Sequence, residues 1–280
     1  MNAYPPVRRS PIAGAWYPSN PALLQTEIDG YINQAQPPDL TGDVIGLIAP
    51  HAGYFYSGPT AGYAYRCVKG SAFDVCAVFS PLHDYMPYDF LTTAHQAYST
   101  PLGLVPVDHT LLAEANQRIE QTIGLPLQPI ANDREHSLEI QLPFLQCALS
   151  MPFTLLPVMV RTNDPTLLEG AARAISEVIK EKKVLLIAST DLSHFYDEQE
   201  ANVLDDAMLN QMIRFSPQGV LEAERCGEGF ACGAGAVALM LWLAKFLDAH
   251  QVTLLHHSTS AQASGDSSRV VGYGALAVTK

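Results

Sequence analysis

The chain has 280 residues, of which 48% are hydrophobic and 16% charged, and its formal net charge at pH 7 is −12. A chain of this length and composition buries a large core without disulfides, which excludes a disordered protein and a small disulfide-stapled domain. Nucleic acid and anionic membranes attract proteins with a positive footprint, so we expect this acidic chain to bind neither.

The cysteine spacing and the composition of residues 1–10 predict where in the cell the protein lies. The five cysteines are scattered and include no C-x-x-C pair, which argues against a disulfide framework and a zinc ribbon and favours reduced thiols. Residues 1–10 contain no apolar segment of the signal-peptide type, and the apolar run 234–247 is too short to span a bilayer. We therefore expect a soluble, cytoplasmic protein.

Apolar, β-branched runs alternate with amphipathic helical patterns, which is typical of a mostly parallel sheet covered on both faces. The first helix is predicted to begin after Asn20, with Pro21 at its first position. Further helices are predicted over residues 59–68, 165–180, 198–213 and 232–249. Strands are predicted over residues 44–49, 73–79, 153–160, 184–188, 252–257 and 270–278, with hairpin-like additions in the region 87–106. The prediction is a single three-layer α/β domain spanning residues 1–280.

Two histidines follow two of the predicted strands. His51 comes directly after the strand 44–49, and His83 comes after the strand 73–79. One β-α-β crossover separates them, so we expect both at the carboxyl edge of neighbouring parallel strands. Open α/β sheets bind ligands along that edge, and two imidazoles there begin a plausible transition-metal site.

A third strand end and a glycine-rich turn add to this pattern. Asp191 and His194 follow the strand 184–188, and Cys232 lies between glycines at a predicted helix start. The N-terminus of a helix favours the thiolate, the form that binds metal, and the flanking glycines would leave room for a ligand. The alternative is structural: a histidine at a strand end is often simply hydrogen-bonded, and a lone cysteine is often a small buried apolar residue.

His136 lies in the segment Asp-Arg-Glu-His-Ser-Leu-Glu at 133–139, just before an apolar helical pattern. Its neighbour Ser137 could serve as an N-cap, and the two glutamates could be simple helix-dipole partners. The adjacent His256 and His257 would point to opposite faces of a strand, and we expect them to be structural.

Five segments in order resemble the MEMO family (mediator of ErbB2-driven cell motility) and its microbial relatives, including protein B of the AmmeMemoRadiSam system. They are Gly-Ala-Trp-Tyr-Pro at 14–18, Ala-Pro-His-Ala-Gly-Tyr-Phe-Tyr-Ser-Gly at 49–58, Glu-His-Ser-Leu-Glu-Ile-Gln-Leu-Pro-Phe at 135–144, Ser-Thr-Asp-Leu-Ser-His at 189–194, and Ser-Gly-Asp at 264–266 with Val-Gly-Tyr at 271–273. The resemblance implies a fold like that of class III extradiol dioxygenases, with a pocket at a strand edge.

The resemblance also implies roles for individual residues. The metal ligands would be His51, His83 and Cys232, Asp191 would line the pocket, and His194 and His136 would take the places of the acid–base histidines. The metal implied is iron, or possibly copper. The dioxygenases themselves hold ferrous iron with two histidines and a carboxylate. The thiol at position 232 is softer, suits copper or zinc better, and can be oxidised.

Three functions remain open from the sequence. The first is a metal-dependent oxidoreductase acting on a small aromatic or enol, in which His194 moves protons and Asp191 orients substrate or ligand. The second is a signalling or interaction module that uses the pocket to hold a metal, a small-molecule or peptide ligand, or a partner protein without turnover, with the ligand docking over Tyr54 and Tyr56. The third is a metal-assisted hydrolase with Asp191 or Asp84 as further ligands.

Overall fold

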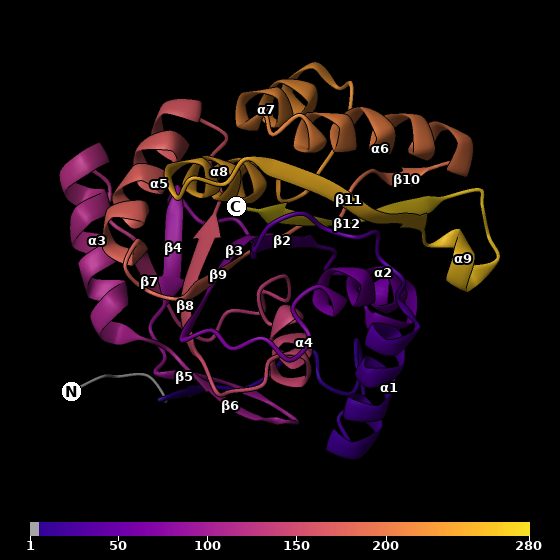
Figure 1. Cartoon of the computed structure of the whole chain (residues 1–280), viewed down its shortest axis with the longest axis horizontal. Coiled ribbons are helices and arrows are strands. Elements are labelled where there is room, and N and C mark those ends of the chain that lie inside the picture. The colour runs from indigo at the N-terminus through magenta and orange to yellow at the C-terminus, as the bar shows by residue number, and fades with distance from the viewer. Residues whose placement is uncertain (1–5) are drawn as a thin grey trace.

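The structure, a computed structural model, describes residues 6–280 and is built around a nine-stranded mixed sheet (Figure 1). The sheet order is β10-β12-β2-β9-β3-β8-β4-β7, and β11 pairs with β12 outside that path. The strands of this sheet are β2 (Val44–Ala49), β3 (Val75–Pro81), β4 (Phe90–Thr93), β7 (Gln128–Ile130), β8 (Thr154–Val160), β9 (Val184–Ser189), β10 (His194–Tyr196), β11 (Gln251–Thr259) and β12 (Val270–Thr279).

Parallel pairing in this sheet is found among the four central strands and between β4 and β7 at one edge. Strands β2, β9, β3 and β8 run parallel, whereas β12 pairs antiparallel with β2 and β4 pairs antiparallel with β8. The sheet is therefore mixed, and the expectation of a mostly parallel sheet is confirmed only for the four central strands and the β4–β7 pair. The reason at the C-terminal side is the short connection between β11 and β12, which suits a hairpin and not a crossover.

Helices cover both faces of the sheet (Figure 1). In Figure 1, α1, α2 and α4 lie on one side of the strands, and α3, α5 and α8 lie on the other with α6 and α7 beside α8. The helices are α1 (Pro21–Gln34), α2 (Tyr54–Arg66), α3 (His109–Ile123), α4 (Gln141–Ala148), α5 (Pro165–Ile179), α6 (Glu198–Ile213), α7 (Pro217–Cys226), α8 (Ala234–Phe246) and α9 (Ala261–Ser264). Within residues 6–280, none of these helices combines the length and apolarity needed to cross a membrane.

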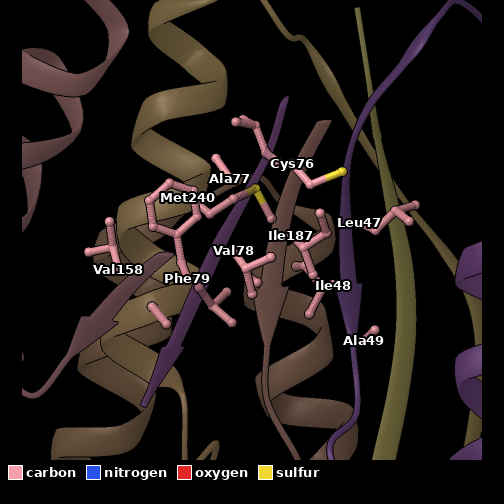
Figure 2. Close-up of a cluster of buried hydrophobic side chains, with 14 of the residues drawn as sticks. Leu47, Ile48, Ala49, Cys76, Ala77, Val78, Phe79, Val158, Ile187 and Met240 are labelled. Atoms are coloured by element: carbon pink, nitrogen blue, oxygen red, sulfur yellow. The ribbon is translucent and has the colours of Figure 1, made fainter. Parts of the chain in front are cut away.

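The core lies between the central strands and α8. Figure 2 shows Met240 of α8 among Ala77 and Phe79 of β3 and Ile187 of β9, all of them fully buried. Because helices pack on both faces, the central strands are apolar at nearly every position and do not alternate. This burial explains why continuous apolar runs predicted these strands well.

Two predicted helix boundaries are wrong, and three helices were not predicted. Helix α2 begins at Tyr54 and contains Pro59 in its interior, because the Tyr54 N–H donates to the Trp16 carbonyl at 2.9 Å and turns the chain before the proline. Helix α8 spans Ala234–Phe246, shorter than the predicted 232–249. Helices α3, α7 and α9 were not predicted, although all three end at a glycine with positive φ and α3 and α7 also have side-chain N-caps.

The region 87–106 adds strands, as expected, but to two different sheets. Strand β4 joins the main sheet, whereas β5 (Ala97–Thr100) and β6 (Gly103–Pro106) form a hairpin in a separate sheet with β1 (Val7–Arg8). This small sheet places Arg8 against the segment 133–139.

Arg8 is the buried cation that fixes this segment. Its guanidinium lies 2.7 Å from an Asp133 carboxylate oxygen and 2.5 Å from a Glu139 oxygen, and it donates to the Glu135 carbonyl at 2.6 Å. The Tyr17 hydroxyl also donates to Glu139, at 2.6 Å. Burial alone would lower the pKa of Arg8, but the hydrogen bond and charge of Asp133 raise it above its usual value. The segment is therefore held by charge-assisted hydrogen bonds.

We predict opposite effects for alanine at two helical glycines, Gly62 of α2, which packs against α1, and Gly30 of α1, which faces open space. At Gly62, a Cβ would lie 2.6 Å from the Tyr31 carbonyl oxygen, so Gly62→Ala should destabilise the protein by about 1–2 kcal/mol despite its better helix propensity. At Gly30, a Cβ meets no atom within 4 Å, so Gly30→Ala should stabilise by about 0.5–1 kcal/mol. Urea unfolding measures both, and equal effects of the same sign would contradict this helix contact.

Replacing Arg8 should cost far more than replacing an exposed arginine. Arg8→Met leaves two buried carboxylates without their cation, and we expect a loss of about 3–5 kcal/mol in the free energy of unfolding. Arg118→Met, which removes a half-exposed pair with Glu177, is the matched control and should cost under about 1 kcal/mol. Similar losses for the two variants in urea unfolding would show that the Arg8 cluster does not anchor the fold.

Candidate metal centre

The carboxyl ends of three central strands meet at one cavity. His51 follows β2, Asp191 follows β9 and His83 follows β3, and all three line a cavity of about 630 Å³. The prediction that β2 and β3 are neighbours is wrong, because β9 pairs with both and lies between them. His51, Asp191 and His83 nevertheless lie at the same edge of the sheet, because β2, β9 and β3 run parallel. Cavities of about 690 and 840 Å³ elsewhere have no histidine in their lining.

His51 is buried, and a hydrogen-bond chain sets its tautomer. The Ser189 hydroxyl donates to the Ser137 carbonyl at 2.6 Å and accepts from the Gln141 amide at 2.7 Å. Its single hydrogen is thus used, so the His51 Nδ1, 3.1 Å away, must be the donor in that contact. The lone pair of His51 is then on Nε2. Burial, together with the charges of His136 and His83, lowers the pKa of His51 and keeps the ring neutral, as a metal ligand must be.

Glu135 orients His83. The buried carboxylate accepts from the His83 backbone N–H at 2.6 Å and ring Nδ1 at 3.0 Å, and from the backbone N–H groups of His136 and Ser137 at 2.9 and 2.8 Å. Burial alone would raise the pKa of Glu135, but these hydrogen bonds, led by the His83 ring, hold it well below its usual value. The same ring hydrogen bond raises the pKa of His83. Glu135 and Glu139 are therefore not simple helix-dipole partners, since both are buried acceptors with defined donors.

Three histidines converge at this point. His51, His83 and His136 each offer one ring nitrogen, and these nitrogens all lie within 4.8 Å of one another. The His83 and His136 rings stack with centroids 4.7 Å apart, and both stand edge-on to His51. Burial lowers the pKa of His136 to about 4, so this ring too is neutral at pH 7. Three converging imidazoles are a donor set suited to zinc, copper or iron, so the residues fit a transition metal.

Cys232 contacts this group without belonging to the three-histidine cluster. Its Sγ lies 3.0 Å from the His51 Nε2 and accepts the Asp191 backbone N–H at 3.2 Å. The expectation that the helix N-terminus favours the thiolate is wrong. Helix α8 begins two residues later, and burial together with the Asp191 charge raises the pKa of the thiol above its usual value.

The glycine beside Cys232 has a packing role and does not make room for a ligand. A Cβ at Gly233 would lie 2.4 Å from the Ser189 carbonyl oxygen, so the turn before α8 packs directly on the end of β9. The Gly233 N–H also donates to the Thr190 hydroxyl at 2.9 Å. Close backbone packing is thus what places Cys232 beside His51.

Asp191 and His194 line the same cavity with different partners. An Asp191 carboxylate oxygen accepts the His51 backbone N–H at 2.7 Å, and burial raises the pKa of Asp191 to about 7. The His194 Nδ1 donates to the Leu192 carbonyl at 2.8 Å, which leaves Nε2 as the acceptor, and burial lowers the pKa of His194. Asp191 therefore holds the turn that carries His51, and His194 offers a neutral base.

Aromatic side chains surround the cavity mouth. Trp16, Tyr56 and Phe195 are exposed and line it, and the Trp16 ring lies 4.2 Å from the His136 ring. Tyr54, which the sequence placed on a docking surface, is instead buried, and its hydroxyl donates to the Ile140 carbonyl at 2.7 Å. Only Tyr56 of that pair can contact a ligand.

The sequence analysis missed the residues that orient the site. Glu135, Ser189 and Arg8 were not recognised, although Glu135 directly precedes a candidate histidine and Ser189 ends a predicted strand. The structural expectation for the histidine pair on β11 is confirmed. His257 Nε2 lies 2.8 Å from the buried Asp205, and His256 stacks on Tyr63 at 4.2 Å.

Comparison with known proteins supports the resemblance to the MEMO family over nearly the whole chain. The sequence pattern of the family described as "Memo-like protein" matches residues 8–277. A MEMO1 family protein of Nitrosopumilus maritimus (strain SCM1) is 31% identical over 278 residues, covering 96% of this chain and 98% of its own. One from Methanopyrus kandleri is 31% identical (96% and 98% covered), and one from Methanosarcina barkeri is 29% identical (97% and 100% covered). The chain therefore belongs to the Memo-like protein family.

Proposed function

We propose that this protein is a metal-dependent oxidoreductase that holds one iron or copper ion at the edge of its sheet and acts on a small aromatic or enol substrate, in the manner of extradiol dioxygenases. The observation that carries the proposal is the convergence of three imidazoles, with ring nitrogens within 4.8 Å of one another, at the base of a cavity large enough for such a substrate. The orientation of His51 and His83 by Ser189 and Glu135 supports it, because metal-binding histidines commonly donate their other ring N–H to an oxygen acceptor.

The proposed ligands are His51, His83 and Cys232. The thiol is supported by its 3.0 Å contact with the His51 Nε2, the nitrogen left free for a metal. The thiol is protonated in the absence of a metal, since its pKa is raised, but a coordinated metal deprotonates a thiol outright. His136 is the alternative third ligand, because its ring nitrogen lies within the same cluster. A set with sulfur favours copper, whereas three imidazoles suit iron, copper or zinc.

A metal held by His51, His83 and Cys232 would supply Lewis-acid and redox chemistry toward a diol or enol and dioxygen. The chain itself supplies the remaining functions. His194, with Nδ1 committed to the Leu192 carbonyl, can take a substrate hydroxyl proton at Nε2. Asp191 fixes the His51 turn, and the rings of Trp16 and Tyr56 can pack on an aromatic substrate and exclude water.

A second candidate function is binding without turnover, and the exposed aromatic rim favours it. Trp16, Tyr56 and Phe195 are all exposed and line the cavity, an unusual concentration of apolar rings around one site. Such a rim could hold a peptide or small molecule over a metal that has no catalytic role. The two functions differ in one measurable property, which is turnover.

Elemental analysis of the purified protein tests the metal site. We expect about one iron or copper ion per wild-type chain and a loss of metal in His51→Ala and His83→Ala. Cys232→Ser and His136→Gln identify the third ligand, because only the true ligand should lower the metal content when changed. A sulfur-to-copper charge-transfer band that disappears in Cys232→Ser would give independent support.

His109→Gln, at an exposed histidine outside the cavity, is the matched control and should retain its metal. Full metal content in His51→Ala would contradict the proposed centre. Loss of metal in Asp191→Asn, with full content in Cys232→Ser, would favour the hydrolase hypothesis instead.

Oxygen consumption tests the reaction. Protein loaded anaerobically with ferrous iron should consume oxygen with at least one catechol, and His194→Gln should lower the rate by about 10²–10⁴-fold while leaving the metal content unchanged. Bound metal with no oxygen uptake across a panel of catechols would contradict the oxidoreductase and support the binding function.

A further inference from the structure

Phe195 has an unfavourable position for a residue that only packs. Its φ is 66°, in the left-handed region that bulky side chains rarely adopt, and its side chain is 61% exposed. The pairing of β10 with β12 shifts register at this residue, between His194 and Tyr196. The strained backbone at Phe195 turns its ring toward solvent, so the strain adds no apolar burial to the core. We therefore look for a role of this ring at the cavity.

Arg269 lies over this ring. Its guanidinium carbon is 5.3 Å from the Phe195 ring centroid, and both residues line the cavity that contains the three histidines. The ion pairs found for arginines of residues 6–280 involve Arg8, Arg118, Arg173 and Arg225, so Arg269 is stacked but has no carboxylate partner there. Stacking on a ring face leaves the N–H donors at the guanidinium edge free for a planar anion.

The charges around Arg269 favour a singly charged partner. Among the described residues that line the cavity, Arg269 is the only lysine or arginine. Asp266 on the same turn is ionised, since hydrogen bonds from the Ser268 side chain and backbone lower its pKa, and its carboxylate is engaged by those bonds. One cation beside one fixed carboxylate, on a chain of net charge −12, suits a carboxylate better than a dianionic phosphate.

We infer that Arg269, positioned by the Phe195 ring, is the specificity-determining residue of the cavity and binds the carboxylate of an aromatic or enol substrate whose oxygens face the histidines. This inference rests on the proposed function, because it places the ligand's other end at the metal centre. Arginine and carboxylate form a planar two-bond pair, which fixes orientation as well as charge. The substrate class is thereby narrowed to hydroxylated aromatic or enolic acids.

Equilibrium binding to the metal-loaded protein tests the inference with a matched pair of ligands. 3,4-Dihydroxybenzoate carries the carboxylate, and 3,4-dihydroxybenzamide replaces it by a neutral group of nearly the same shape. We expect the wild type to bind the acid about tenfold more tightly than the amide, as measured by calorimetry. Arg269→Gln should remove this preference with little change in affinity for the amide. Arg269→Lys, which keeps the charge but not the planar fork, should retain part of it.

Arg173→Gln is the matched control, because Arg173 is likewise an exposed arginine over a phenylalanine ring, 4.4 Å from the Phe246 centroid, but lies outside the cavity. It should keep the full preference. The inference is overturned if the preference persists in Arg269→Gln, if the wild type shows none, or if neither compound binds. Tighter binding of phenyl phosphate than of the acid, lost in Arg269→Gln, would overturn the carboxylate assignment.

Metal content measured on the same samples separates the two proposals. A metal-free wild-type protein contradicts the metal centre itself, whereas full metal content with equal affinities for acid and amide contradicts only the role of Arg269.

Discussion

The buried carboxylate of Glu135 is the interaction on which the geometry of the site depends. It accepts four N–H groups, two from His83 and one each from His136 and Ser137, so a single side chain fixes two of the three converging histidines. The segment that carries Glu135 is itself held by Arg8, which reaches it from the N-terminal strand β1. A carboxylate buried this deeply stays ionised because its oxygens accept hydrogen bonds from these four N–H groups. The stability of this corner of the fold and the orientation of the site therefore have one physical origin.

The third histidine is fixed from the other side, by the strand between β2 and β3. Ser189 at the end of β9 contacts the His51 ring, and Asp191 two residues later accepts the His51 backbone N–H. Because β9 pairs with both neighbours along its length, small displacements of any one strand are resisted by two ladders of hydrogen bonds. A rigid parallel centre is thus what holds the ring nitrogens of histidines far apart in sequence within 4.8 Å of one another.

Much of this arrangement could be predicted from the sequence where the signal is local. Burial on both faces makes the central strands continuous apolar runs, and helix α6 has the predicted boundaries, 198–213. The candidate residues His51, His83, His136, Asp191 and His194 all line one cavity, and Cys232 contacts His51. What failed depends on distant partners. The start of α2 is set by the Trp16 carbonyl, the order of β9 between β2 and β3 is a matter of topology, and the pKa of Cys232 is set by burial that no local pattern records.

Several polar groups of the cavity lower the free energy of unfolding, whereas the apolar residues of the core raise it. Burial disfavours the charged forms of His51, Asp191 and Cys232, and Phe195 adds a strained backbone of about 1–3 kcal/mol. The strain at Phe195 gains little from burial, since Phe195 and Arg269 are exposed and the Phe195 ring contacts Arg269 and the His194 ring. The apolar core between the central strands and α8 offsets these costs. Side chains that lower stability are expected to gather in one cavity where a chain is selected for binding. In this cavity they extend from the histidines at the base to the arginine at the mouth. A ligand that satisfies both ends at once would remove the desolvation cost at the base and engage the free cation at the rim.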